Sequence, residues 1–352
     1  VFLAPAFAAL TLGIVGVKDY PLQCAKNEGY KHAGTMFGAG LSFVFALHFG
    51  IASIFIITAI LGAFSLVVLG FIQKSSIDDF TARGEIHAEK GVRNFAKTSI
   101  WALFANKRVL FLGAVMFCFH LSNAAMLPLL SQRAQTLGVD SSGAYAAATI
   151  FIAQGTMIVV AYLCARLMRK NLSNLGENST LHSNLTSNSA FVSNSTPNSN
   201  KNLPNAIKPN SLQTNSHARA EFTMYFWLFF ACFFALIIRG GVAANFTQTG
   251  AMIAVQILDG VGAGVSGVIL PVIVAFILRG SGHINAGLAF VMTCGGLGGA
   301  LSASAGGYFA EFYGYFSAYV FLGAVAGVGL VLWVLGARRL FGVGKIWQKA
   351  EI

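Results

Sequence analysis

The chain has 352 residues, of which 56% are hydrophobic and only 10% are charged, and its formal net charge is +11. Soluble domains usually carry about 25% charged residues, so composition excludes an ordinary soluble fold. A mean hydropathy of +0.69 instead indicates an integral membrane protein. The five cysteines follow no disulfide or zinc-binding spacing, so neither a disulfide framework nor a metal site is expected.

Nine apolar runs follow one another along the chain, and most are long enough to span a bilayer, which takes about 20 residues as a helix. They lie near residues 1–17, 32–49, 51–72, 108–130, 143–167, 222–240, 250–279, 284–310 and 314–336. Each run is continuous rather than alternating, which predicts an all-α membrane bundle and excludes a β-barrel. The first run is short and lacks the features of a signal peptide, so we expect the parent protein to begin upstream of Val1.

The basic residues are concentrated in alternate connections between these runs. Of the 23 Lys and Arg residues, 21 lie in or beside such connections, and only Arg133 and Arg239 are assigned to the opposite side. The positive-inside rule therefore places the basic connections and the C-terminus in the cytoplasm. Because the basic residues reflect membrane topology and form no separate basic domain, nucleic acid is not an expected partner.

Residues 171–216 are dominated by Asn and Ser and have too little apolar surface to fold, so they are predicted to be a disordered cytoplasmic insertion. Asn-x-Ser/Thr triplets in this segment resemble glycosylation sites, but a cytoplasmic location argues against that modification.

The first three runs repeat the order of features seen in the last three. In each copy a Pro-bearing span leads to a polar cytoplasmic turn, a glycine-rich span, a tight outer turn and a smooth apolar span. The polar turns contain Asn27 and His283, and the tight turns lie at Gly50 and Gly314. Such internal repeats are typical of secondary transporters, whose binding sites lie between the repeats.

Three stretches carry a resemblance to a known family: FHLSNAAMLPLL (119–130), QILDGVGAGVSGVILPVIVAFILRG (256–280) and NAGLAFVMTCGGLGGALSASAGGYFAEFYGYFSAYVFLGAVAG (285–327). They resemble an uncharacterised bacterial branch of the major facilitator superfamily (MFS), and the resemblance covers nearly the whole chain outside 171–216. In the place of the family's second cytoplasmic loop motif, ARLMRKN (165–171) keeps basic residues but lacks the expected acid and glycines, so a gating role for this loop is not implied.

The resemblance implies an MFS-type bundle in which nine of twelve transmembrane helices, helices four to twelve, are present. Residues 1–72 would be the last three helices of the N-terminal half, and 73–107 the cytoplasmic loop between the halves. Residues 108–336 would be the six-helix C-terminal half, which contains the 171–216 insertion, and 337–352 a cytoplasmic tail.

Asp259 is the first candidate for a proton-coupling residue, because an acid inside a span is retained only where it faces other helices or a wet cavity. Gln256 lies three residues earlier on nearly the same helix face, where it could bond the acid or a substrate. The alternative is that Asp259 is a structural acid bonded to a neighbouring helix, or that it lies near enough to the outer surface to be solvated.

His120 and Asn123 share a helix face in the fourth run, ahead of Pro128, and Gln154 lies within the fifth. His120 could bind a proton near neutral pH, and all three could contact a substrate. The alternative is that they form hydrogen bonds between helices.

Glycine pairs spaced four apart predict close packing of helices: Gly34 with Gly38, Gly260 with Gly264, and Gly295 with Gly299. Glu28, Lys31 and His32 are assigned to the cytoplasmic mouth of the second run. They are interpreted as solvated topology charges, with gating ion pairs as the alternative.

The predicted function is secondary active transport of a small molecule across the bacterial inner membrane by alternating access. Proton-coupled efflux is preferred on family resemblance, and an uptake symporter or a non-transporting sensor or scaffold are the alternatives. The seven histidines form no metal-binding box and no nucleotide-binding motif is present, so an enzyme, a cofactor and an ATP-driven pump are not expected. The expected partners are the substrate, protons and the lipid bilayer, and the protein is expected to be a monomer. The polar residues do not encode the identity of the substrate.

Overall fold

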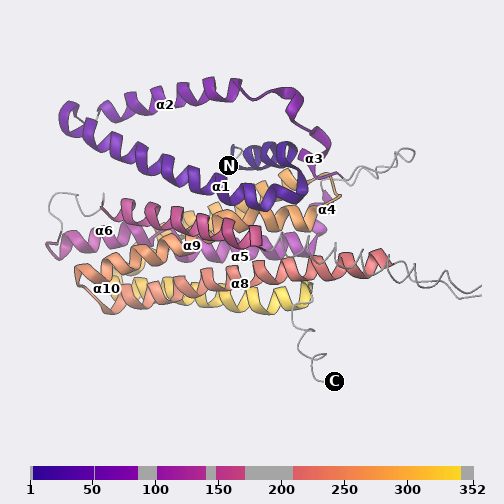
Figure 1. The fold of residues 1–352 in the computed structure, drawn as a ribbon. Coiled ribbons are helices and arrows are strands. Elements are labelled where there is room, and N and C mark those ends of the chain that lie inside the picture. Colours follow the sequence, from indigo (N-terminus) through magenta and orange to yellow (C-terminus); the bar gives the residue numbers. More distant parts are fainter. Residues whose placement is uncertain (1–2, 51, 86–100, 140–147, 171–208, 342–352) are drawn as a thin grey trace, which may run out of the picture.

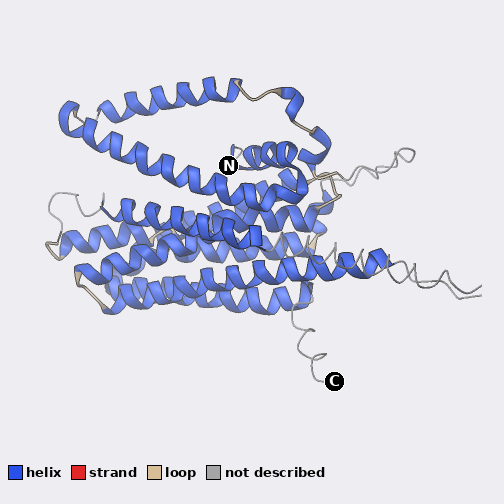
Figure 2. Ribbon diagram, viewed as in Figure 1, coloured by secondary structure: helices blue, strands red, loops and turns tan. Residues whose placement is uncertain are grey.

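The computed structural model describes residues 3–50, 52–85, 101–139, 148–170 and 209–341, and these form helices and loops without any strand (Figure 2). The helices, in chain order, are α1 (Leu3–Phe49), α2 (Ala52–Gly70), a 3-10 turn (Lys74–Ser76), α3 (Asp79–Arg83), α4 (Trp101–Ala105), α5 (Lys107–Asn123), α6 (Met126–Thr136), an unlabelled helix (Ala148–Lys170), α8 (Pro209–Asn245), α9 (Thr249–Leu278) and α10 (Ile284–Phe341).

Seven helical segments in the described part of the chain are long and apolar enough to cross a membrane. Two of them, α1 and α10, are interrupted where Gly16 and Gly314 adopt φ values of 74° and 79°. This left-handed backbone suits glycine and reverses the chain between two helices. The predicted all-α membrane bundle is therefore confirmed for the described residues.

The boundary between the first two predicted runs is wrong. A polar turn was expected around Asn27, but the chain turns at Gly16 and is helical from there to Phe49. The polar side chains of this stretch bond within the helices instead. Gln23 donates to Asn27 Oδ1 at 2.9 Å, and Asn27 donates in turn to Thr11 Oγ1 at 3.0 Å. These side-chain hydrogen bonds therefore lie in a helix that hydropathy alone begins too late, at residue 32 instead of after Gly16.

The fourth predicted run is divided into α5 and α6 at Ala124 and Ala125. Pro128 accounts for the interruption, since proline lacks an N–H and its ring crowds the carbonyl four residues earlier, which here is that of Ala124. The freed Ala125 N–H donates to the Ser302 hydroxyl of α10 at 3.0 Å. At Pro271, in contrast, α9 continues as a helix to Leu278.

The tightest packing lies among the helices that follow the connection at 71–107. Helix α10 packs along α5 and α8, and α8 packs along α9, so these helices form the body of the bundle in Figure 1. The core between them contains Trp333, Phe119, Phe229 and Phe233, all at most 1% exposed. Helix α2 lies at the margin and diverges from α1 beyond the turn at Gly50 that joins them (Figure 1), and its buried residues are Ser53 and Ile57, near that turn.

Helix α3 lies between α1 and the turn that joins α9 to α10. The Asp78 side chain accepts from Phe80 N and Thr81 N, which caps the start of α3. The Asp78 N–H donates to the Gly13 carbonyl of α1 at 3.0 Å, while the Gly84 carbonyl accepts from Gly280 N at 2.7 Å. The start of the connection is therefore attached both to a helix before it and to a turn after it.

Candidate functional site

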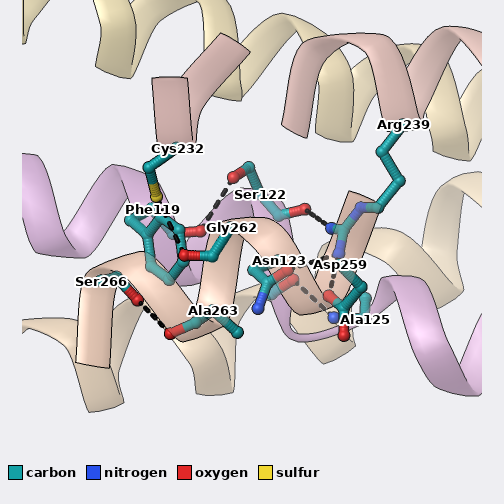
Figure 3. Close-up of polar contacts among 11 residues, drawn as sticks. Phe119, Ser122, Asn123, Ala125, Cys232, Arg239, Asp259, Gly262, Ala263 and Ser266 are labelled. Carbon is teal, nitrogen blue, oxygen red and sulfur yellow. Dashed lines mark hydrogen bonds and ion pairs between the residues drawn. The ribbon is translucent and has the colours of Figure 1, made fainter. Parts of the chain in front are cut away.

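A buried ion pair joins α8 and α9. Arg239 is 1% exposed, and its Nη1 contacts Oδ1 of Asp259, whose side chain is 15% exposed (Figure 3). Either ion alone would be costly inside a membrane, at about 3 kcal/mol on insertion scales. Pairing removes much of that cost for both, because the two charges are desolvated together. The predicted intramembrane acid therefore has a specific partner on the neighbouring helix.

The same guanidinium reaches the interruption between α5 and α6. Its Nη1 donates to Asn123 Oδ1 at 2.6 Å, and its Nη2 is 3.4 Å from the Ser122 carbonyl oxygen (Figure 3). The carboxyl end of a helix presents unpaired carbonyls and the negative end of its dipole, both of which favour a cation. Arg239 therefore connects three helices, and it brings together two predicted residues, Asp259 and Asn123.

The side chains of the other two predicted residues near this cluster, Gln256 and His120, form no hydrogen bonds among the described residues. Gln256 is 1% exposed, its Oε1 has no partner, and its side chain makes no described hydrogen bond to Asp259. His120 packs against α10 at Gly295, where an added Cβ would lie 2.6 Å from the imidazole Cδ2. The glycine leaves room for the ring between the two helices.

Gln154 belongs to a separate polar cluster between the Ala148–Lys170 helix and α1. Its Oε1 lies 2.7 Å from Nδ1 of His32, whose Nε2 is 3.4 Å from Glu28 Oε2. Lys31 also contacts Glu28 and is largely exposed, as expected for a topology charge. His32 is only 7% exposed, so the interpretation of it as a solvated residue is wrong. Because α1 continues as a helix through residue 32, the His32 side chain lies between α1 and the Ala148–Lys170 helix.

The predicted packing glycines differ in their surroundings. An added Cβ on Gly260 would lie 2.8 Å from the Ala153 carbonyl oxygen, and one on Gly264 would lie 3.1 Å from Val160, so α9 lies against the Ala148–Lys170 helix at both. An added Cβ on Gly299 would be in ordinary van der Waals contact with Ala124. At Gly34 and Gly38, no described atom lies within 4 Å of such a Cβ.

Sequence reasoning missed Arg239, which it assigned with Arg133 to the side of the membrane opposite the basic connections. The structure corrects this assignment, because Arg239 lies within the apolar part of α8 and is almost fully buried. A signal was present in the sequence. Arg239 precedes and Asp259 follows the short α8–α9 turn at similar distances along the chain, so adjacent antiparallel helices place them at a similar depth. Arg133 does lie near that end of the bundle, where it donates to the Ala243 carbonyl near the end of α8.

Comparison with known proteins places this architecture in a family. Residues 1–187 match the model of the Major Facilitator Superfamily. Two curated relatives, both named uncharacterized MFS-type transporters, come from Mycobacterium tuberculosis strains CDC 1551/Oshkosh and ATCC 25618/H37Rv. Each is 28% identical over 332 residues, which cover 94% of this chain and 67% of the relative. No solved structure matches the chain.

Proposed function

Because the chain belongs to the Major Facilitator Superfamily, we propose that it is a secondary active transporter of a small molecule in the bacterial inner membrane. In this proposal, the protein works by alternating access and couples efflux of the molecule to proton entry. Membership of the family supports a membrane transporter. The observation that supports proton coupling is the buried Arg239–Asp259 pair and its link to Asn123.

The pair offers two protonation states with different contacts. With Asp259 ionised, Arg239 has a counter-ion on α9 and acceptors at the α5–α6 interruption. With Asp259 protonated, the guanidinium loses its counter-ion while Asn123 and the Ser122 carbonyl remain. Because an uncompensated buried charge is strongly unfavourable, protonation would favour a rearrangement of α8, α9 and the α5–α6 interruption. Such a change of relative stability is what coupling to a proton requires.

Two alternatives remain part of the proposal. The ion pair has no preferred direction, so an uptake symporter would use the same chemistry. A non-transporting sensor or scaffold would retain the pair as a structural bond between helices and would move neither protons nor solute.

A flux assay separates these alternatives. The purified full-length protein is reconstituted into vesicles that contain the pH indicator pyranine, with the membrane potential clamped by valinomycin and equal potassium. A panel of amphipathic compounds, beginning with ethidium, is then added outside. Antiport raises the lumenal pH as the compound enters, and symport lowers it. No pH change with any compound would contradict transport, and control vesicles without protein report passive leak.

The role of Asp259 is tested in the same vesicles with Asp259→Asn, which keeps the shape of the side chain but removes the titrating group. We expect the compound-driven pH change to fall at least tenfold, because the amide of Asn cannot bind and release a proton as the carboxyl group of Asp259 does. A variant that still exchanges protons like the wild type would show that Asp259 is structural.

A further inference from the structure

The cluster of Glu28, His32 and Gln154 connects parts of the chain that lie on opposite sides of the 71–107 connection. Glu28 and His32 are on α1, before the connection, while Gln154 follows it. In contrast, Asn123, Arg239 and Asp259 all follow the connection. If the segments before and after the connection move against each other during transport, that motion acts directly on the His32–Gln154 contact. It leaves the Arg239–Asp259 pair within one moving body.

The hydrogen-bonding requirements of His32 leave room for one more proton. Its Nδ1 lies 2.7 Å from the amide oxygen of Gln154. An amide oxygen only accepts, so Nδ1 carries the hydrogen and, in the neutral ring, Nε2 is an acceptor. This Nε2 is buried without a hydrogen-bond partner and lies 3.4 Å from Oε2 of Glu28, which is also buried. Two acceptors facing each other repel, whereas a proton on Nε2 turns the contact into an attraction between opposite charges.

We propose that Glu28 and His32 together bind a proton at the contact between α1 and the Ala148–Lys170 helix, as a second coupling site besides Asp259. This inference rests on the proposed transport function and specifies where its second proton binds.

The groups around the proposed site leave this proton role to the pair. On α1, Lys31 contacts Glu28 from the exposed side and Cys24 lies one turn earlier. The Ala148–Lys170 helix contributes the neutral amide of Gln154. Helix α9 contributes Gly267, where an added Cβ would lie 2.7 Å from Glu28 Oε2. Helix α3 also packs on α1, but its described hydrogen bond is to Gly13, before the turn at Gly16.

Protonation of the pair strengthens the contact across the connection. An imidazolium donates from both nitrogens, and a charged donor makes a stronger bond to the Gln154 oxygen than a neutral one. The conformation that contains this contact therefore binds the proton more tightly than one in which α1 and the Ala148–Lys170 helix have separated. By linkage, releasing the proton favours separation. The hydrogen bond and the proton thus stabilise the same state.

Nitrogen NMR of the full-length protein labelled with 15N-histidine tests the proposal, with His32→Asn used to assign the His32 signals. We expect Nδ1 to keep its proton while Nε2 gains one as the pH is lowered. Glu28→Gln removes the carboxylate and should weaken proton binding about tenfold or more. Gln154→Leu removes the acceptor and should release the ring into a mixture of both neutral tautomers. Glu311→Gln, which neutralises an exposed acid on α10, is the control and should leave the His32 titration unchanged.

Three results would overturn the proposal: a His32 signal that does not titrate, one that carries its neutral hydrogen on Nε2, or an unchanged titration in Glu28→Gln. The first two are read from the wild-type protein once His32→Asn has assigned the signals, so poor folding of Glu28→Gln or Gln154→Leu leaves the test intact. The outcome is independent of the vesicle assay. A silent flux assay with a titrating His32 would count against transport, while normal flux without titration of His32 would count against this site alone.

Discussion

Arg239 and Asp259 are stable inside the bundle only as a pair. Arg239 is fully buried and its Nε has no hydrogen-bond partner, so the contacts through Nη1 and Nη2 supply its electrostatic compensation. Removing one ion leaves the other buried and uncompensated, which typically costs about 3–5 kcal/mol. Removing both abolishes that penalty, although the hydrogen bonds to Asn123 and Ser122 are lost as well. The two residues should therefore be strongly non-additive.

A double-mutant cycle measures this coupling. We expect Asp259→Asn and Arg239→Gln each to lower the free energy of unfolding by about 3 kcal/mol, and the double variant to be at least as stable as either single variant. Unfolding of the detergent-solubilised protein by increasing SDS provides the measurement. Glu311→Gln, which neutralises an exposed acid on α10, is the control for a simple change of charge. Additive losses in the double variant would show that the two ions do not stabilise each other.

At this scale, sequence reasoning identified Asp259 and Asn123 in one polar cluster and Gln154 in the other, but it did not predict that Arg239 and His32 are their partners. Asp259 is conspicuous because an acid interrupts an apolar run, and Gln154 because an amide does. Arg239 was assigned to the side opposite the basic connections, since hydropathy cannot distinguish a cation near a helix end from one that faces an acid on the next helix. The pairing of His32 with Gln154 depends on the rotation of α1 about its axis, which its sequence alone does not determine.

Helix α9 is the element on which both clusters depend. It carries Asp259 toward α8 and passes Gly267 beside Glu28 of α1. Between these points it lies close to the Ala148–Lys170 helix, with Gly260 against Thr156 and Ala153 and Gly264 against Val160. Gly260 and Gly264 therefore set the distance between α9, which carries Asp259, and the Ala148–Lys170 helix, which carries Gln154.

Substituting Gly260 tests this close approach. In Gly260→Ala the new methyl group would meet the backbone at Ala153, and overpacking of this kind costs about 1–3 kcal/mol. Gly296→Ala on α10 is the matched control, because nothing lies within 4 Å of its added Cβ and alanine favours a helix more than glycine does. We expect a lower thermal midpoint for the first variant in detergent, and an unchanged or higher one for the second. Equal midpoints would mean that the helices are not in contact at Gly260.

Element boundaries were predicted well where the chain turns sharply at a glycine of positive φ and poorly where polar residues enter a helix. Gly50 and Gly314 have φ values of 80° and 79°, and both tight turns lie where the sequence places them. The helix between Gly16 and Phe49 was cut short because Lys, Asn and Glu lower hydropathy without breaking a helix. The interruption at Ala124 follows from Pro128, but Pro271 shows that proline alone does not decide where a helix ends.

Across the whole molecule, the connection at 71–107 and the polar clusters suggest how two bodies could exchange conformations. Helix α3 is hydrogen-bonded both to α1 and to the α9–α10 turn at one end of the bundle. The His32–Gln154 contact joins the same two parts of the chain. A transport cycle that separates these parts would break the His32–Gln154 bond while the Arg239–Asp259 pair remains within the later helices. Orientation of the bundle decides from which side each cluster receives its proton.

The proposed orientation is tested by labelling single cysteines in intact cells, in a background where the five native cysteines are replaced. We expect Ser193→Cys, within the Asn- and Ser-rich segment, to be protected from an impermeant maleimide, because the positive-inside rule places residues 171–216 in the cytoplasm. Thr247→Cys, in the exposed α8–α9 turn, should react without permeabilisation. Permeabilised cells should label both. The reverse pattern would invert the bundle, so that proton entry from outside would reach Glu28 and His32 through the opposite end of α1.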